Sequence, residues 1–263
     1  MKIVIVLPVY NEEKSIRSLV EKIRRSMRHA GLPYSIVLVD DGSTDGSFAI
    51  AQCLVRSHRV GVMRHGRNEG LGRTIRDGLR VAVEACSEED AVVTMDADNS
   101  QPPEVIPEMV KRLRAGADIV IASRYARGSR SLHVPVYRRL ISWAGNIAFR
   151  CRIRAKRVRD YTCGFRAYRA SVLNSGFRAY GEQLVKSEGF ECMAEILIKL
   201  CRLGARAGEV AFTLDYGAKP SLSKMNLRRT LLGNLRILLA RHRGSGNRGL
   251  LTVHRGWART PGS

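Results

Sequence analysis

The chain has 263 residues, of which 44% are hydrophobic, and its formal net charge at pH 7 is +21. A chain of this length and apolar content can bury the core of one large domain, so its stability does not require disulfides. The charge favours partners rich in phosphate, such as nucleic acid, an anionic membrane surface or a phosphorylated substrate. The surplus is uneven, because residues 224–263 contain nine Lys or Arg and no Asp or Glu.

The cysteines and the apolar segments bear on location. None of the six cysteines forms a C-x-x-C pair or a zinc-binding spacing, so we expect reduced thiols in a cytoplasmic protein. No stretch of about 18 uncharged apolar residues is present, and no transmembrane helix is predicted. The first apolar run, residues 3–7, is too short for the core of a secretion signal. The expected location is the cytoplasm, with attachment to the cytoplasmic membrane surface left open.

Short apolar runs and amphipathic segments alternate through the first 125 residues. The apolar runs predict buried strands at residues 2–7, 35–39, 59–64, 91–95 and 119–122. Helical spacing of the apolar residues between them predicts helices at residues 11–30, 44–55, 70–85 and 103–115. This order indicates an α/β fold with a mainly parallel sheet flanked by helices, in which ligands bind beyond the carboxyl ends of the strands.

The pattern is less regular after residue 125. We expect a mobile Gly- and Arg-rich loop at 127–132, a compact polar and aromatic segment at 160–168, and a strand at 207–216. Further helices are predicted at 137–150, 189–203 and 227–241. The chain therefore divides into a domain at residues 1–225, a basic amphipathic helix at 226–243 and a basic tail at 244–263 that we expect to be disordered.

Pairs of acidic residues follow two of the predicted strands. Asp96 and Asp98 come directly after the strand at 91–95, where a divalent cation would offset their mutual repulsion. Asp40 and Asp41 follow the strand at 35–39. Both pairs also suit a plainer role, because Asp, Gly and Ser favour turns and helix caps.

These acidic pairs belong to a longer series of motifs. In chain order, five motifs stand at residues 7–13 (LPVYNEE), 39–45 (VDDGSTD), 68–72 (NEGLG), 96–98 (DAD) and 123–125 (SRY). The series closely resembles family 2 glycosyltransferases, which have the fold called GT-A. Three more motifs extend the likeness to the polyprenyl-phosphate (dolichyl-phosphate) mannosyltransferase branch, at residues 160–166 (DYTCGFR), 188–190 (EGF) and 223–224 (SK).

The resemblance implies an inverting glycosyltransferase that moves a hexose from a nucleotide sugar to a polyprenyl or dolichyl phosphate. Mannose from GDP-mannose is the implied donor, although UDP-sugars stay open. The nucleotide sugar would contact Pro8, Tyr10, Glu12, Asp40, Asp41, Gly72 and Asp96. Asp98 and Ser100 would hold the cofactor, Mg²⁺ or Mn²⁺. The implied catalytic residues are Asp96, Asp98, Arg124 and Asp160, and those for the acceptor phosphate are Arg124, Arg138, Arg139, Arg166 and Lys219.

Two positions depart from that branch. Ser100 stands where relatives often have a metal-binding Gln, and a hydroxyl is a shorter and weaker ligand. Gly217 and Ala218 stand where relatives often have Asp and Arg. The next residue, Lys219, can replace that arginine only as a point charge. The substrates are therefore less firmly predicted than the class of enzyme.

The nature of the acceptor decides whether a general base is needed. A lipid monophosphate is already anionic near neutral pH, so catalysis becomes a matter of positioning and charge neutralisation. A hydroxyl acceptor needs a base, and Asp160 is the candidate. Basic and apolar residues mix at 137–143 and 225–243, which suits peripheral contact with a membrane or ordinary helices that face the core.

Other functions remain open at this stage. A soluble family 2 transferase that acts on a small-molecule or natural-product hydroxyl is the main alternative. A non-catalytic, metal-free relative is disfavoured by the intact pair of Asp96 and Asp98. Nucleic-acid binding rests on charge alone, because the chain has only 6% aromatic residues and no nucleic-acid-binding motif.

Overall fold

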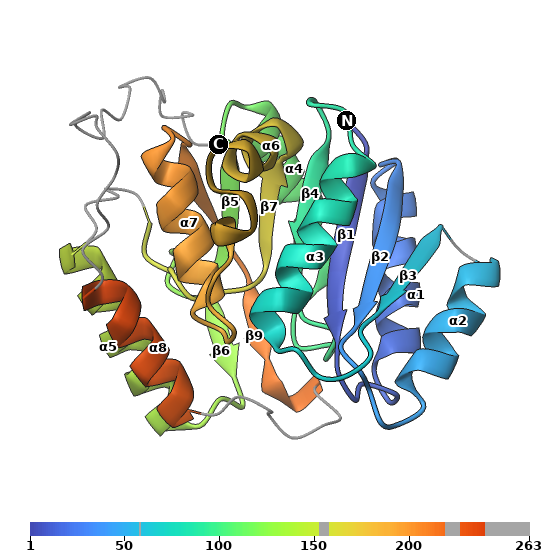
Figure 1. Cartoon of the computed structure of the whole chain (residues 1–263), viewed down its shortest axis with the longest axis horizontal. Coiled ribbons are helices and arrows are strands. Elements are labelled where there is room, and N and C mark those ends of the chain that lie inside the picture. The colour runs from blue at the N-terminus through green and yellow to red at the C-terminus, as the bar shows by residue number, and fades with distance from the viewer. Residues whose placement is uncertain (58, 153–157, 219–226, 240–263) are drawn as a thin grey trace.

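A seven-stranded sheet runs through the computed structural model, which describes residues 1–57, 59–152, 158–218 and 227–239 (Figure 1). The order of its strands is β3-β2-β1-β4-β7-β5-β8. Every pairing is parallel except the two that β7 makes. Helices cover both faces of the sheet, as the alternating pattern of the sequence predicted.

The sheet has seven strands, and most of them are apolar runs because both faces of the sheet are covered. They are β1 (Ile3–Val9), β2 (Tyr34–Asp40), β3 (Val60–Arg64), β4 (Ala91–Thr94), β5 (Ile119–Ser123), β7 (Arg166–Arg169) and β8 (Ala207–Ala211). The central strand β1 shows the effect most clearly, since the side chains from Ile3 to Leu7 have no exposed surface. These strands form the middle of the hydrophobic core.

Most of the helices pack one apolar face against this sheet. The helices are α1 (Ile16–His29), α2 (Ser47–Ser57), α3 (Leu71–Glu84), α4 (Ile106–Arg114), α5 (Val136–Arg152), α6 (Ala170–Tyr180), α7 (Cys192–Arg202) and α8 (Leu227–Leu239). Short 3₁₀ turns are η1 (Pro103–Val105), η2 (Gly181–Leu184) and η3 (Tyr216–Ala218). In Figure 1, α3 and α7 lie in front of the sheet, and α1 and α4 lie behind it.

The antiparallel strand β7 was not predicted. It lies between β4 and β5, and Arg166 is the partner of both Thr94 and Ile121. Its four residues include two arginines and a tyrosine, so neither length nor apolar character marks it as a buried strand. Because it runs against its neighbours, its first residue lies at their carboxyl ends. The preceding segment, 160–165, is thereby brought to the edge where ligands are expected.

A small second sheet corrects two other expectations. Residues 127–132 are not simply a loop, because β6 (Arg130–Leu132) pairs in parallel with β9 (Thr213–Asp215). The strand expected at 207–216 is divided between two sheets, since β8 ends at Ala211 and β9 pairs elsewhere. The pattern of a single strand does not reveal its partner, so the division could not be predicted.

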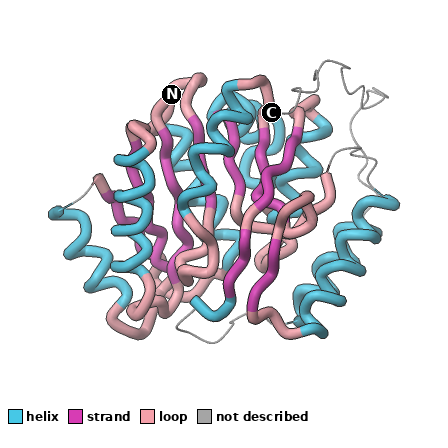
Figure 2. Tube along the Cα trace, turned by 180° about the vertical axis from the view of Figure 1, so that it is seen from behind, coloured by secondary structure: helices cyan, strands magenta, loops and turns pink. Residues whose placement is uncertain are grey.

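Two helices, α5 and α8, lie side by side at one end of the molecule in both views (Figures 1 and 2). Helix α8 falls within the segment 226–243 that was predicted as a basic amphipathic helix. The predicted tail at 244–263 lies outside the described residues, as do Lys219 and the motif at 223–224. None of the described helices has the length and apolar character needed to cross a bilayer.

A close contact at Gly72 gives a test of this fold. A Cβ atom at this position of α3 would lie 1.7 Å from the carbonyl oxygen of Ser187. We predict that Gly72→Ala lowers the free energy of unfolding by about 1–3 kcal/mol, because backbone must move to relieve the overlap. Gly145→Ala is the control, since no atom lies within 4 Å of the new methyl group on α5. Denaturant titration measures both, and equal stabilities would contradict the contact.

Candidate active site

A cavity of about 930 Å³ opens at the edge where the parallel strands end. Ten of the residues predicted from the sequence line it, namely Pro8, Tyr10, Glu12, Asp41, Asp96, Asp98, Ser100, Arg124, Arg138 and Arg139. The volume is near the upper end of the range for small-molecule sites, so the cavity has room for more than one ligand. The order of the strands places Asp41, Asp96 and Arg124 along this edge from β2 to β5.

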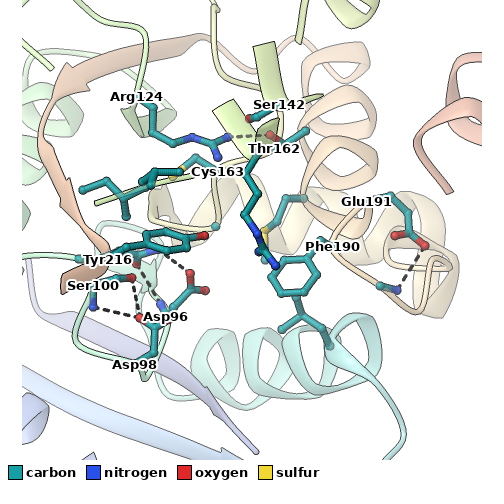
Figure 3. A pocket seen from close by; sticks show the side chains of 18 of the residues that line it. Asp96, Asp98, Ser100, Arg124, Ser142, Thr162, Cys163, Phe190, Glu191 and Tyr216 are labelled. Carbon is teal, nitrogen blue, oxygen red and sulfur yellow. Dashed lines mark hydrogen bonds between the residues drawn. The ribbon is translucent and has the colours of Figure 1, made fainter. Parts of the chain in front are cut away.

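The acidic turn after β4 is held in shape by its own neighbours (Figure 3). Asp96 donates its backbone N–H to Gln101 Oε1 at 2.9 Å, and Gln101 Nε2 donates to Asp96 Oδ2 at 2.7 Å. Ser100 donates to Asp98 Oδ1 from its backbone nitrogen at 3.0 Å and from its hydroxyl at 2.5 Å. Both carboxylates are therefore fixed before any ligand arrives, which limits the cost of ordering them on binding.

Asn99 makes the tight turn between these residues. Its φ of 65° lies in the left-handed region, which Asn adopts more readily than most residues. Its side-chain amide donates to the Ser15 carbonyl at 3.1 Å and to Ser18 Oγ at 2.7 Å, which ties the turn to α1. On the other side, Asp215 N–H donates to the Ser100 carbonyl at 3.1 Å. The turn is thus held by α1 on one side and by the small sheet on the other.

Across the cavity, Arg124 is fixed by a buried carboxylate. Its Nε donates to Asp160 Oδ2 at 2.8 Å and its Nη2 donates to Asp160 Oδ1 at 2.7 Å. The Nη2 atom also donates to Thr162 Oγ1 at 2.7 Å, a contact drawn in Figure 3. Within the described residues, no hydrogen bond uses Nη1. Arg124 lines the cavity, so Nη1 is the part of the guanidinium left for a ligand.

Asp160, the base predicted for a hydroxyl acceptor, is placed away from the cavity. It has no exposed surface, does not line the cavity, and also accepts hydrogen bonds from the backbone of Arg124, Thr162 and Cys163. Burial raises its pKa, but the charge and hydrogen bonds of Arg124 outweigh burial and lower the pKa below the ordinary 3.8. A carboxylate that is inaccessible and hard to protonate is a poor general base. Asp160 instead holds Arg124 in place.

At the other end of the cavity, Asp41 organises a loop. Its carboxylate accepts hydrogen bonds from His65 Nδ1 at 2.8 Å, from Glu69 N–H at 2.9 Å and from Gly70 N–H at 3.0 Å. These bonds connect the end of β2 to the start of α3. Asp41 lines the cavity, but its oxygens already have these partners, so its main effect is on the shape of the loop.

Asp40 is buried beside this loop. It has no exposed surface and does not line the cavity. Arg64 Nε lies 3.2 Å from Oδ2, and among the described residues neither carboxylate oxygen has a well-formed hydrogen bond. The Arg64 guanidinium stacks at 4.1 Å over Phe48. Buried oxygens without a donor are uncommon, so the carboxylate of Asp40 has unused hydrogen-bonding capacity.

Gly72 and Arg166 do not lie where the sequence-based roles require. Gly72 N–H donates to the Glu188 carbonyl at 2.8 Å, and Gly72 supports the segment 187–191 rather than lining the cavity. Arg166 has no exposed surface. Its guanidinium donates to the backbone carbonyls of Cys163, Met193 and Tyr161. Its donors are therefore used within the core, which corrects its assignment to the acceptor phosphate.

Several residues of the site were missed from the sequence. Gln101 holds Asp96, Thr162 contacts Arg124, and Tyr216 and Phe190 line the cavity (Figure 3). Thr162 and Phe190 lie inside the motifs at 160–166 and 188–190, but neither position had been given a role. Gln101 and Tyr216 lie outside the motifs, so no comparable signal marked them.

Comparison with known proteins identifies the family of this chain. The family model described as "Glycosyl transferase family 2" matches residues 4–177. The chain belongs to glycosyl transferase family 2. It is 34% identical over 219 residues to a dolichol-phosphate mannosyltransferase of Pyrococcus furiosus, which covers 83% of this chain and 58% of that protein. It is 32% identical over 214 residues to an undecaprenyl-phosphate mannosyltransferase of Micrococcus luteus, covering 81% and 83%.

A third relative carries a different sugar in its name. An undecaprenyl-phosphate 4-deoxy-4-formamido-L-arabinose transferase of Pectobacterium carotovorum is 36% identical over 160 residues, which is 60% of this chain and 45% of that protein. The family 2 chain therefore spans about half the length of the Pyrococcus and Pectobacterium relatives.

Solved structures confirm the fold. A glucosyl-3-phosphoglycerate synthase of Mycobacterium tuberculosis, in complex with Mn²⁺, UDP and phosphoglyceric acid, matches with a TM-score of 0.61. The identity is 20%, and the match covers 90% of this chain and 76% of that one. The predicted α/β architecture of GT-A type is thus confirmed.

The ion pair between Asp160 and Arg124 gives a second test. We predict that Asp160→Asn lowers the free energy of unfolding by about 3–5 kcal/mol at pH 7, because it removes a fully buried carboxylate and leaves the partly buried guanidinium of Arg124 without its counter-charge. Glu21→Gln is the control, since it removes a partly exposed pair with Arg24 and costs at most about 1 kcal/mol. Denaturant titration at pH 7 compares the two variants.

The same variant has an expected pH dependence. Folding lowers the pKa of Asp160, so its ionised form stabilises the fold above the unfolded pKa of about 3.9. This contribution is lost as the pH falls through the folded pKa. The difference in stability between wild type and Asp160→Asn should therefore be complete at pH 7 and shrink below about pH 4. A difference that stays constant down to pH 3 would contradict an ionised Asp160.

Proposed function

We propose that this chain transfers a hexose, with inversion, from a nucleotide sugar to a polyprenyl phosphate. The observation that carries the proposal is the composition of one wall of the cavity. Helix α5 contributes Arg138 and Arg139 together with Leu140 and Trp143, which are exposed yet line the same cavity. A polyprenyl phosphate combines an anionic head with an apolar chain, and this wall offers partners to both.

The arrangement of charge supports an anionic acceptor over a neutral hydroxyl. Arg124, Arg138 and Arg139 all line the cavity, and Asp160, the base predicted for a hydroxyl acceptor, is committed to Arg124. A phosphate oxygen needs no base, so the protein's task is to orient it and to neutralise charge. The names of the three relatives also contain dolichol phosphate or undecaprenyl phosphate, which supports this class of acceptor.

The opposite side of the cavity suits the donor. Pro8, Tyr10 and Glu12 line it at the end of β1, and Asp40 lies buried nearby with acceptor oxygens for the N–H groups of a base. We propose GDP-mannose as the donor, because two relatives are named mannosyltransferases. The formamido-arabinose transferase shows that the choice of sugar varies among related proteins, so the donor has to be tested directly.

The acidic turn fits a divalent cation bound together with the donor. Asp98 and Ser100 both line the cavity and offer only oxygen atoms, the ligands that Mg²⁺ and Mn²⁺ prefer. No group of three or more His, Cys, Asp or Glu side chains in the described part of the chain could hold a metal alone. A cation held by one or two carboxylates needs phosphate oxygens to complete its shell. When bound, it would neutralise the departing diphosphate.

The donor is tested by a thermal-shift panel of GDP- and UDP-sugars, with and without Mn²⁺. We expect GDP-mannose with Mn²⁺ to raise the melting temperature, because ligands that bind the folded state stabilise it. The shift should disappear in Asp98→Ala and persist in Glu108→Ala, a control that removes an exposed carboxylate of α4 paired with Arg112. A shift with a UDP-sugar alone would change the donor. No shift with any sugar nucleotide would overturn the proposed function.

Helices α5 and α8 also carry an exposed apolar surface. Large apolar side chains are exposed on α5 and α8, namely Val136, Tyr137, Leu140, Trp143, Leu232, Leu235 and Leu239. Arg138 and Arg139 lie among those of α5. Apolar side chains beside basic ones favour the interface of an anionic bilayer, where each cation contributes about 1 kcal/mol. We propose peripheral contact there, which would bring the cavity to the lipid acceptor.

Flotation with vesicles that contain anionic phospholipid tests this surface. The wild-type chain should float with the vesicles at moderate salt, and the double variant Leu140→Ser, Trp143→Ser should lose most of this binding, because apolar burial is removed. The control is Val55→Ser, Val81→Ser, which changes exposed apolar residues on α2 and α3. Equal flotation of the two double variants would reject α5 as the contact.

A further inference from the structure

Two buried side chains connect helix α5 to the rest of the protein, and Tyr125 Oη adds a hydrogen bond to Ser142 Oγ at 2.9 Å. Of its described side chains, only Asn146 and Phe149 are buried, at 3% and 0% exposure. Phe149 stacks on Tyr161 with ring centroids 5.6 Å apart. Packing against Tyr161 therefore explains why Phe149 is buried. Asn146 is a polar group in the same buried seam, so its hydrogen bonds need an account of their own.

Asn146 bonds to the segment that holds Arg124. Its Oδ1 accepts the Tyr161 N–H at 2.6 Å, and its Nδ2 donates to Thr162 Oγ1 at 3.3 Å and to the Ser142 carbonyl at 2.8 Å. Thr162 Oγ1 also accepts the bond from Arg124 Nη2 at 2.7 Å. A hydroxyl oxygen has two lone pairs, and these two donors match them. One oxygen atom thus joins the helix to the arginine.

The other side of this segment is held by β8. Glu209 Oε1 accepts the backbone N–H groups of Arg159 at 2.6 Å and of Asp160 at 2.8 Å. Among the described residues, every side-chain hydrogen bond of Arg124 goes to Asp160 or Thr162. The direction of the guanidinium therefore depends on a segment fixed by Glu209 at one end and by Asn146 at the other.

We propose that Asn146 is a positioning residue for the acceptor phosphate. Acting through Thr162, it keeps Arg124 Nη1 turned into the cavity, where it can donate to a phosphate oxygen. The identity of that phosphate rests on the function proposed above, whereas the positioning of Arg124 does not. Since Asn146 belongs to the helix proposed to contact the membrane, it also ties the phosphate-binding arginine to the membrane-facing surface.

Two variants break this connection. Asn146→Ala removes the amide group on α5, and Thr162→Val removes the hydroxyl to which both Asn146 and Arg124 donate. The control is Cys151→Ala, which alters an exposed residue of the same helix. The first readout is the ¹⁵Nε–¹Hε resonance of Arg124 in the full chain, assigned by its loss in Arg124→Lys. This N–H donates to Asp160, so its chemical shift reports the orientation of the guanidinium in the absence of a ligand.

The second readout is the affinity for farnesyl phosphate, with the KM for the nucleotide sugar measured in parallel. We expect both variants to shift or broaden the Arg124 resonance and to weaken farnesyl phosphate binding about tenfold, while the donor KM stays within about twofold. The double variant should be no worse than the worse single variant, because both remove one connection. The control should match the wild type in each measurement.

Each outcome bears on one claim. An unchanged Arg124 resonance in folded Asn146→Ala overturns the positioning role, whatever happens to turnover. If Asn146→Ala does not fold, Asn146→Asp gives the test, because it keeps an acceptor for the Tyr161 N–H and removes the donor to Thr162 Oγ1. If the resonance moves but wild-type protein does not bind farnesyl phosphate, the positioning role stands and the proposed acceptor is wrong. An equal loss of donor and acceptor affinity would indicate general damage and reject a specific role.

Discussion

Asp160 has no exposed surface, and its carboxylate binds the Arg124 guanidinium through two side-chain hydrogen bonds of 2.7 and 2.8 Å. Neither group can be removed without leaving the other charge unpaired, so the two are fixed together. This constraint orders the arginine before a ligand binds and leaves Nη1 for the cavity. The carboxylate of Asp160 is paired with Arg124, so it is not available as the base that a hydroxyl acceptor would need. This favours an acceptor that is already anionic.

The cavity therefore has two sides of opposite character. The turn at residues 96–101 presents fixed carboxylates and a hydroxyl, which suit a cation with a diphosphate. The wall from Arg124 to α5 presents guanidinium groups and exposed apolar side chains. In the proposed function, the first side binds the sugar-nucleotide donor and the second binds the lipid phosphate. Membership of family 2 agrees with this division, and the substrates themselves are matters for the binding experiments.

Much of the fold and part of the site could be predicted from the sequence. Apolar runs marked the five parallel strands of the first half, and the polar residues that follow them, such as Asp98 and Arg124, line one cavity. The prediction failed for β7, because four residues with two arginines carry no apolar signature. It also did not reveal that Asp160 binds Arg124 or that Arg166 binds backbone carbonyls in the core, since a charged residue in a motif looks the same whether it faces a ligand or the core.

The sequence by itself determined the α/β order, the residues at the ends of the parallel strands and the family, because these depend on local pattern and spacing. Only the tertiary structure decided which charges are available to a ligand. Antiparallel β7 brings residues 160–165 to the open edge, where Asp160 is paired with Arg124. Asn146 and Thr162 fix the direction of that arginine. Such assignments depend on burial and on contacts between segments far apart in the chain, which no local pattern contains.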